Sequence, residues 1–308
     1  MSTQDVSTQD GHLCLGTAPD SWGVWFPEDP RQVPWTRFLD EAARSGYKWI
    51  ELGPLGYLPT DPERLSDELD ARGLRLSAGT VTAGLQRGSA ALEEARDQAG
   101  RVARLVASLG ARHLVLLPEM HRDLDGRQVF SPMLSGEEWK DLVTGVSALS
   151  REMLDTYGVS VELHPHADSH VDSQERVERL LEETAGEPVS LCLDTGHIAY
   201  CGGNSAELIV RYPDRIGYVH LKAVDPAVME IVRREDLGFA EAVRRGAMVE
   251  PPNGEPAMEP LLHQLEGLGV DLFTIVEQDL FPCDPGVPFP IACRTQRYLT
   301  SCSVSWRC

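Results

Sequence analysis

The sequence has no long hydrophobic run and comparatively few positive charges. None of its apolar stretches approaches the ~18 residues that a membrane-spanning helix needs, so no membrane partner is expected. Lysine and arginine together number 28 against 48 aspartates and glutamates, which gives a net charge of −20. Because nucleic-acid binding requires a clustered cationic face, no nucleic-acid partner is expected either.

Paired cysteine motifs, phosphate-binding loops and targeting signals are also missing. The seven cysteines show neither CxxC pairs nor zinc-ribbon spacing, which favours reduced thiols and a cytoplasmic location. Residues 1–10 contain no basic cluster and no apolar core, so we expect a disordered lead-in and no secretory signal. No P-loop or G-x-G-x-x-G motif appears, and this absence favours an unphosphorylated substrate.

Short apolar runs alternate with longer amphipathic stretches along the whole sequence. The first four runs cover residues 13–18, 48–52, 75–81 and 113–117, and four more end near Glu162, Asp194, His220 and Glu277. The intervening stretches have helical spacing, as in 61–72, where an Asp-Pro pair begins a helix. Eight strand–helix units close most readily into a barrel. The sequence therefore predicts a single (β/α)8 TIM barrel over residues 11–300, followed by a flexible tail over 301–308.

The longest irregular stretch, residues 223–256, lies between the seventh and eighth predicted strands. It is rich in proline and contains a predicted helix over 236–245. Long loops at the catalytic rim of a barrel are often lids or specificity loops. A plain surface excursion has equal weight as an explanation.

Four successive predicted strands each end on a residue that can bind a hard metal ion: Glu162, Asp194, His220 and Glu277. In a parallel barrel such positions converge at the carboxyl ends of the strands, where active sites lie. A single acid at a strand end is more often a helix cap or an ion-pair partner. Several carboxylates aimed at one point, however, repel one another unless a cation is present. The set therefore predicts a site for Mn²⁺, Co²⁺, Mg²⁺ or Zn²⁺.

The two glutamates of this set also suggest a reaction. A metal that polarises the carbonyl of an α-hydroxy ketone makes the adjoining carbon acidic, and a nearby carboxylate can then remove its proton. Glu162 and Glu277 suit this acid–base pair, although both can also serve as ligands alone. Returning the proton to the other face gives epimerisation, moving it to the next carbon gives isomerisation, and losing a β-hydroxyl gives dehydration.

Several longer motifs carry a resemblance to a known family. They are Ala18-Pro19-Asp20-Ser21-Trp22-Gly23-Val24-Trp25, Trp49-Ile50-Glu51-Leu52-Gly53-Pro54, Leu193-Asp194-Thr195-Gly196-His197, His220-Leu221-Lys222 and Val276-Glu277-Gln278-Asp279. From Gly16 to about Tyr298, the chain resembles the xylose-isomerase-like TIM barrels of the sugar phosphate isomerase/epimerase superfamily. Within it, the inosose dehydratases and inosose isomerases are the most similar.

The resemblance implies a metal-dependent lyase or isomerase that acts on a keto-inositol or a related keto-sugar. It implies a divalent metal, Mn²⁺ or Co²⁺ first and Mg²⁺ or Zn²⁺ otherwise, held by Glu162, Asp194, His220 and Glu277, and a dimeric or tetrameric assembly. The N-terminal tryptophan-rich motif favours dehydration. Many inosose dehydratases, however, have a histidine-rich run where this chain has 162–166, and a glutamate at that place is similar to the epimerases and isomerases. A metal-dependent phosphoesterase and a non-catalytic sugar-binding barrel are the alternatives.

Other side chains near the strand ends are candidates for substrate binding. The resemblance implies that His197 reaches substrate oxygens, with a structural hydrogen bond as the alternative. Lys222 could anchor a hydroxyl, carboxylate or phosphate, or pair with a glutamate, and Glu51 could bind a hydroxyl. His164 and His166 alternate with Glu162 and could bind substrate or replace a metal ligand. Trp22, like Trp25 and Tyr57, offers a ring that can stack on a sugar, although core packing explains each equally well.

Overall fold

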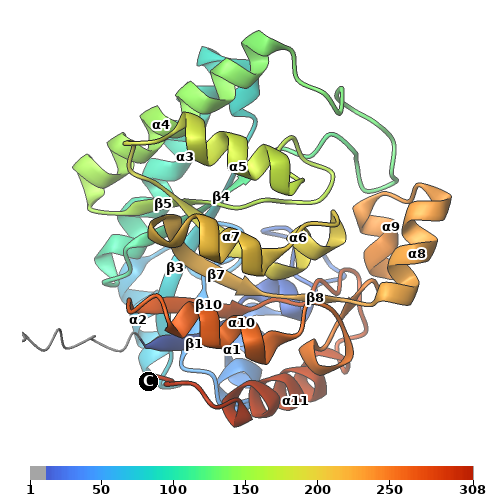
Figure 1. The fold of residues 1–308 in the computed structure, drawn as a ribbon. Helices are drawn as coiled ribbons and strands as arrows, with labels where there is room; N and C mark the ends of the chain where they lie inside the picture. Colours follow the sequence, from blue (N-terminus) through green and yellow to red (C-terminus); the bar gives the residue numbers. More distant parts are fainter. Residues whose placement is uncertain (1–11, 308) are drawn as a thin grey trace, which may run out of the picture.

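Eight parallel strands close into a barrel in the computed structural model, which describes residues 12–307 (Figure 1). Around the ring the order is β1, β10, β7, β6, β5, β4, β3 and β2. Their bounds are β1 Leu13–Thr17, β2 Trp49–Glu51, β3 Arg75–Ala83, β4 His113–Pro118, β5 Ser160–Leu163, β6 Val189–Asp194, β7 Ile216–Leu221 and β10 Leu272–Val276. The predicted single (β/α)8 barrel is confirmed, and all eight predicted strands are present. The predicted lead-in over 1–10 lies outside the described residues.

Helices surround the ring of strands and cover its outer face (Figure 1). They are α1 Trp35–Arg44, α2 Pro62–Asp70, α3 Ser89–Ser108, α4 Gly136–Tyr157, α5 Gln174–Glu183, α6 Thr195–Tyr200, α7 Ser205–Arg211, α10 Met258–Glu266 and α11 Pro288–Ser301. The start of α2 is the one that the sequence predicts, because the Asp61 side chain accepts a hydrogen bond from the Arg64 N–H and proline occupies the first turn. Among residues 12–307 no helix is long and apolar enough to cross a bilayer.

Buried apolar side chains of the barrel and its surrounding helices fill two separate spaces. The larger cluster lies between the strands and the helices, and includes Phe38, Val102 and Leu149. A small cluster inside the barrel contains Ala18, Ala78, Val115, Cys192, Tyr218 and Ile275. Because the barrel interior is packed, ligands have access only to its ends.

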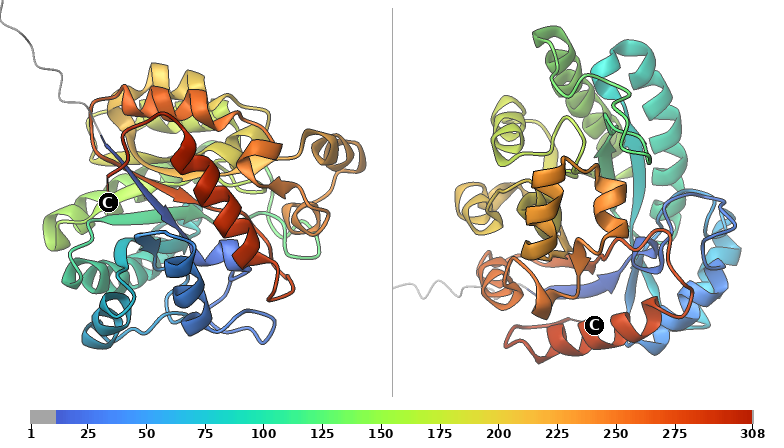
Figure 2. Two further views of the ribbon diagram at one scale, coloured as in Figure 1. Left: turned by 90° about the horizontal axis from the view of Figure 1, so that it is seen from below. Right: turned by 90° about the vertical axis from the view of Figure 1, so that its right-hand side faces the viewer.

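The long segment between β7 and β10 forms a small unit of its own. It contains β8 Ala223–Val224, α8 Pro226–Glu235, α9 Phe239–Arg244 and β9 Met248–Val249, and the two short strands pair antiparallel. The predicted single helix over 236–245 is thus only partly right, since two helices are present. They pack on their own apolar cluster, which includes Met229, Phe239 and Val243. Figure 2, in its right-hand view, shows α8 and α9 in orange in front of the ring of strands.

The end of the chain is ordered against the barrel, and the predicted flexible tail over 301–308 is wrong for its described part. The Leu13 N–H donates to the Ser305 carbonyl oxygen at 3.1 Å, and the Arg307 N–H donates to the Leu13 carbonyl oxygen at 2.9 Å. These bonds hold residues 305–307 beside β1, where they satisfy backbone groups at its first residue.

Candidate metal centre and active-site cavity

Four side chains from adjacent strands meet at the carboxyl end of the barrel. His164 follows β5, Asp194 ends β6, His220 lies on β7 and Glu277 follows β10, and one ligand atom of each lies within 4.8 Å of the others. The His164 Nε2 atom is 3.1 Å from His220 Nδ1 and 3.2 Å from Asp194 Oδ2, and His220 Nδ1 is 2.9 Å from Glu277 Oε2. Ligands about 2.1 Å from one ion lie about 3.0–3.4 Å apart in octahedral or tetrahedral geometry. The spacing and the nitrogen–oxygen donor set therefore fit a divalent metal.

Protein partners fix the orientation of two members of this group. The Asp194 side chain caps α6, because its Oδ1 accepts the His197 N–H at 2.6 Å, and this leaves Oδ2 directed at the other ligands. On the far side of the His220 ring, Nε2 lies 2.9 Å from Glu51 Oε2. The Glu51 Oε1 atom accepts the Thr80 hydroxyl at 2.9 Å. Both oxygens of Glu51 thus have protein partners, which makes it an orienting carboxylate for His220.

Glu162 lies outside the group, which corrects its predicted place beside Asp194, His220 and Glu277 and its predicted role as a proton carrier. His164 occupies the ligand position instead, because it lies two residues further along the same strand face. Glu162 lies one level deeper in the barrel, where its Oε1 is 2.8 Å from His113 Nδ1. Gly217 leaves room for this carboxylate, since a Cβ atom there would collide with Glu162 Oε2. The sequence prediction thus placed a ligand on the correct strand and favoured Glu162, with His164 as a possible replacement, and the structure brings His164 into the group.

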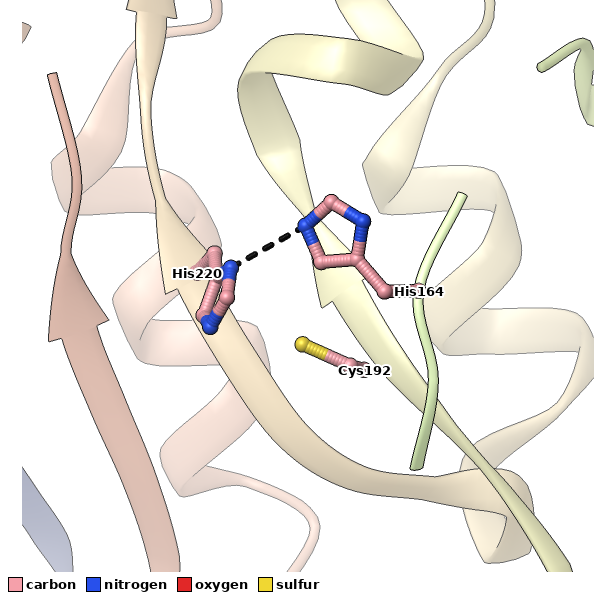
Figure 3. A group of neighbouring side chains, drawn as sticks. All are labelled: His164, Cys192 and His220. Carbon is pink, nitrogen blue, oxygen red and sulfur yellow. Dashed lines mark hydrogen bonds between the residues drawn. The ribbon is translucent and has the colours of Figure 1, made fainter. Parts of the chain in front are cut away.

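A thiol lies directly below the two histidines (Figure 3). Cys192 on β6 directs its sulfur toward the rings of His164 and His220, and these three side chains are buried. Burial raises the pKa of the Cys192 thiol to about 12, so in this setting it is the neutral form that is favoured. The thiol thus forms the floor of the ligand group and does not add to its negative charge.

The side chain of Lys222 reaches the two acids of the ligand group. Its Nζ atom lies 3.3 Å from Asp194 Oδ2 and 3.0 Å from Glu277 Oε2, so it neutralises part of the charge of the two acids. The approach of its chain requires glycine at position 196, because a Cβ atom there would lie 2.5 Å from Cγ of Lys222. The Asp-Thr-Gly-His motif therefore places an acid at the metal position and makes room for the lysine.

Charges in this group are strongly coupled. Burial opposes ionisation of Asp194, but Lys222 and hydrogen bonds from His164 and His220 outweigh it, so the pKa of Asp194 falls well below its usual range. Burial likewise opposes the charge of His220, while the carboxylates of Glu277, Glu51 and Asp194 favour it, and the pKa of His220 rises well above its usual range. A proton on His220 therefore balances the acids here. Because a metal needs the neutral ring, metal binding has to displace this proton.

His166 and His197 form a second pair of rings above the ligand group. Their centroids are 4.0 Å apart, and burial followed by the neighbouring His164 lowers the pKa of His166 to about 3. Burial, His166 and Lys222 lower the pKa of His197 as well. The His197 Nδ1 atom accepts the Ala167 N–H at 3.1 Å, so the neutral ring carries its proton on Nε2. This tautomer makes His197 a hydrogen-bond donor at the cavity wall.

A cavity of about 570 Å³ opens above these residues. His164, His166, His197, His220, Lys222, Glu51 and Glu277 all contribute to its wall. Trp25 and Phe239 close its outer side, with ring centroids 6.0 Å apart in a stacked arrangement. Phe239 starts α9, so the small unit between β7 and β10 supplies part of the wall.

Trp22 is not part of the cavity, which corrects its predicted role in substrate binding. Its side chain is 0% exposed, its indole N–H donates to Glu41 Oε2 at 2.8 Å, and its ring packs edge-on against Phe38. The neighbouring Trp25 takes the wall position. Trp22 lies in a short 3-10 turn, Pro19–Trp22, which directs the ring back between the strands and α1.

Two acids of the cavity wall, Asp20 and Asp279, were not identified from the sequence. Asp279 Oδ2 lies 2.8 Å from Lys222 Nζ, and Asp20 Oδ2 lies 3.9 Å from it. A signal for Asp279 was available, since it follows Glu277 by two residues and so shares its face of the chain. Asp20 lies three residues after the end of β1, in the turn Pro19–Trp22.

Comparisons with known proteins agree with the barrel fold. A family model described as Xylose isomerase-like TIM barrel matches residues 39–280. The chain is 28% identical over 295 residues to an inosose dehydratase from Lacticaseibacillus casei, covering 92% of this chain and 95% of the relative. It is 31% identical over 289 residues to an inosose dehydratase from Geobacillus kaustophilus (90% and 89% covered). Its fold is similar to that of the IOLI protein solved with a zinc atom, at a TM-score of 0.69 and 17% identity, with 93% and 96% covered.

Proposed function

Because the chain belongs to the xylose isomerase-like TIM barrel family, we propose that it is a divalent-metal-dependent enzyme that enolises a keto-inositol or a related keto-sugar. Dehydration is the leading reaction. One observation carries the proposal: four convergent ligand atoms from His164, Asp194, His220 and Glu277 lie at the base of a cavity large enough for a sugar ring. The inosose dehydratases to which the chain is similar over most of its length support the choice of substrate and reaction.

The same four residues would hold the metal. When bound there, the ion polarises the substrate carbonyl and makes the neighbouring carbon–hydrogen bond acidic. Two imidazoles and two carboxylates are ligands that Mn²⁺, Co²⁺ and Zn²⁺ all accept. We favour Mn²⁺ or Co²⁺, with Zn²⁺ and Mg²⁺ as alternatives, and the zinc atom of the IOLI structure supports a divalent ion in this fold.

Glu277 is the best placed residue for removing the substrate proton. Its side chain is 11% exposed, whereas those of Asp194 and His220 are at most 3% exposed, so among these three it is the most accessible from the cavity. In spite of burial, nearby His220 and Lys222 hold the pKa of Glu277 below its usual range, so its side chain is an ionised carboxylate. With Glu162 sealed below, the second proton-transfer group has to come from the cavity wall, where His166, His197 and Lys222 lie.

His197 is suited to bind a substrate oxygen. Its Nε2–H faces Lys222 Nζ at 3.3 Å, and both groups are donors when the lysine is charged. Two donors that converge without an acceptor between them favour an oxygen from the substrate at that place. In dehydration, the carbon–hydrogen proton passes to Glu277, the β-carbon–oxygen bond breaks, and a donor of this wall protonates the departing hydroxide to give water.

Solvent deuterium exchange tests the proposal. The protein is stripped with a chelator, reloaded with Mn²⁺ and incubated in D₂O with a panel of inososes and ketohexoses. We expect deuterium to enter the carbon next to the ketone only with metal, and ultraviolet absorbance of a conjugated dione together with product chromatography to show dehydration. A product that keeps all its oxygens would instead establish epimerisation or isomerisation, and binding without exchange would show a sugar-binding barrel. A cytoplasmic location and a dimer or tetramer stay predictions.

A further inference from the structure

We propose that Asp20 and Asp279, gathered around Lys222, bind two hydroxyl groups of an uncharged polyol and make the cavity reject anionic substrates. The three residues are called the Lys222 cluster below. The inference rests on the proposed function in one respect, namely that the cavity binds a keto-polyol or keto-sugar. Beyond the proposed function, the inference names the residues that select the substrate, and it specifies that the substrate is uncharged.

Geometry places the Lys222 cluster beside the metal ligands and outside them. Lys222 Nζ touches Asp279 at 2.8 Å and Glu277 at 3.0 Å, and Asp20 lies 3.9 Å away. Both Asp20 and Asp279 contribute to the cavity wall, but neither belongs to the group of ligand atoms within 4.8 Å of one another. A ring held at the metal by its ketone can therefore meet these acids with hydroxyls further around the ring.

Asp20 is an acceptor without a partner. Its side chain is 16% exposed, and its Oδ1 atom is buried with no hydrogen-bond partner among residues 12–307. The 3.9 Å from Asp20 Oδ2 to Lys222 is too long for a hydrogen bond. The Asp20 side chain lines the cavity, and its Oδ2 atom lacks a protein donor within hydrogen-bond distance among the described residues. Since acceptors inside native proteins are nearly always hydrogen-bonded, this oxygen points to a donor on the ligand. Hydroxyl groups of a polyol supply such donors, while a phosphate or carboxylate oxygen supplies none when ionised.

The balance of charge in the wall leads to the same substrate class. Asp20, Glu51, Asp123, Glu277 and Asp279 are part of the wall, Lys222 is its one lysine, and no arginine occurs among the described wall residues. Lys222 is already surrounded by Asp194, Glu277 and Asp279. Even beside a divalent ion, which supplies two positive charges, the wall has more carboxyl groups than positive charges. Recognition of a phosphate or carboxylate relies on arginine, lysine or free backbone N–H groups. The described wall offers no arginine and one lysine that acids already surround, so an anionic substituent is disfavoured here.

Different substitutions at Asp20 separate its two roles. Asp20→Asn removes the charge and keeps an acceptor oxygen, whereas Asp20→Ala removes both. The matched control is Asp123→Asn, an acid of the same wall that lies away from Lys222 and whose Oδ1 accepts the N–H groups of Asp125 and Arg127. Asparagine keeps that acceptor, so the control preserves its turn and changes only the general charge of the cavity.

The experiment measures binding of two probes to the Mn²⁺-loaded protein by calorimetry, with metal content and melting temperature recorded for every variant. The probes are myo-inositol, which is neutral, and myo-inositol 1-phosphate. We expect the wild type to bind inositol at least tenfold more tightly than the phosphate. Asp20→Ala should weaken inositol binding at least tenfold, and Asp279→Asn should also weaken it. Asp20→Asn should reduce the preference for inositol over the phosphate, while Asp123→Asn should leave the affinity for inositol within about twofold.

Binding also distinguishes this inference from the proposed function. Suppose that no inosose undergoes exchange but that inositol binding depends on Asp20 as expected. The substrate-binding role of the Lys222 cluster is then confirmed, and the proposed enolisation reaction is refuted. Equal affinity of wild type and Asp20→Ala for inositol, at unchanged metal content and melting temperature, would overturn the inference. So would a wild type that prefers the phosphate. If Asp123→Asn matches Asp20→Asn in both affinities, general charge explains the effect and the specific role of Asp20 is refuted.

Discussion

The barrel interior contains two levels of polar residues, two residues apart along the same strands. The upper level has His164, Asp194 and His220, and the lower level has Glu162, Cys192 and Tyr218 beneath them on β5, β6 and β7. In the lower level the groups pair locally: Glu162 lies 2.8 Å from His113, and the Tyr218 hydroxyl lies 2.7 Å from the Ser77 hydroxyl. In the upper level the ligand atoms converge on one point and face a cavity.

This difference shows that residue type alone does not make a site. The Glu162–His113 pair lies below the cavity and is not part of its wall, although Glu162 Oε2 has no hydrogen-bond partner among residues 12–307. The same chemical groups become reactive where several acceptors share too few donors and a ligand has access. One step of two residues along a strand separates the two cases in this protein.

The largest effect is expected from Glu277→Gln in the upper level. Because the amide cannot accept the substrate proton, deuterium exchange should fall by about 10²–10⁴-fold, while the shape of the residue is kept. Mass spectrometry of the substrate after incubation in D₂O measures the rate. Exchange at the wild-type rate would remove Glu277 from its catalytic role.

A paired substitution on β5 compares the levels directly. His164→Gln should lower the metal content of the purified protein, because it removes one of four ligand atoms. Glu162→Gln should keep the metal content but lower the free energy of unfolding by about 1–3 kcal/mol, since it weakens a buried hydrogen-bonded pair. Inductively coupled plasma mass spectrometry and urea unfolding measure the two quantities. The reverse pattern would return Glu162 to the metal site.

Glu51→Gln tests the orienting carboxylate behind His220. We expect metal affinity to fall by about 10–100-fold, as is typical when the partner of a ligating histidine is lost. Competition with a fluorescent chelator gives the affinity, and Thr80→Val, which removes only the hydrogen bond to the other Glu51 oxygen, serves as a milder control. Unchanged affinity in Glu51→Gln would leave substrate binding as its role.

The smallest effect is expected from Phe239→Ala in the small unit over the cavity. Phe239 packs against Trp25, His166 and His197 with centroid distances of 6.0, 4.9 and 4.9 Å. Loss of these aromatic contacts should raise KM about 3–10-fold and change kcat less. Steady-state kinetics separates the two parameters. A fall in kcat with an unchanged KM would assign Phe239 to the chemistry instead of the wall.

Sequence patterns predicted the barrel because strand and helix periodicity are local properties. They could not separate His164 from Glu162, since both lie on the same inward face and only the register of β5 decides which one reaches the rim. That register pairs Leu163 with Leu116, and the His164 N–H donates to the Leu116 carbonyl oxygen. Depth within a barrel is set by such long-range pairing, which spacing along one strand does not encode.

Other differences between the sequence prediction and the structure have local causes, and some of these causes are visible in the sequence. Asp225 and Pro226 begin α8 with the same cap and proline that begin α2, so this helix was predictable. Trp22 and Trp25 are three residues apart with similar character, and only the turn between them decides which ring faces the cavity. Asp20 is recognisable as a wall residue only when β1 and β10 are known to be neighbours.

The docking of residues 305–307 on β1 has a practical consequence for anyone who handles this protein. Arg307 also pairs with Asp271 at 2.6 Å, so the last part of the chain is attached to the start of both β1 and β10. A shortened version that ends before Ser305 would leave the first residue of β1 without these backbone hydrogen bonds, and we expect it to be less stable. This end of the strands lies opposite to the cavity, so a fusion partner attached on this side would leave substrate entry open.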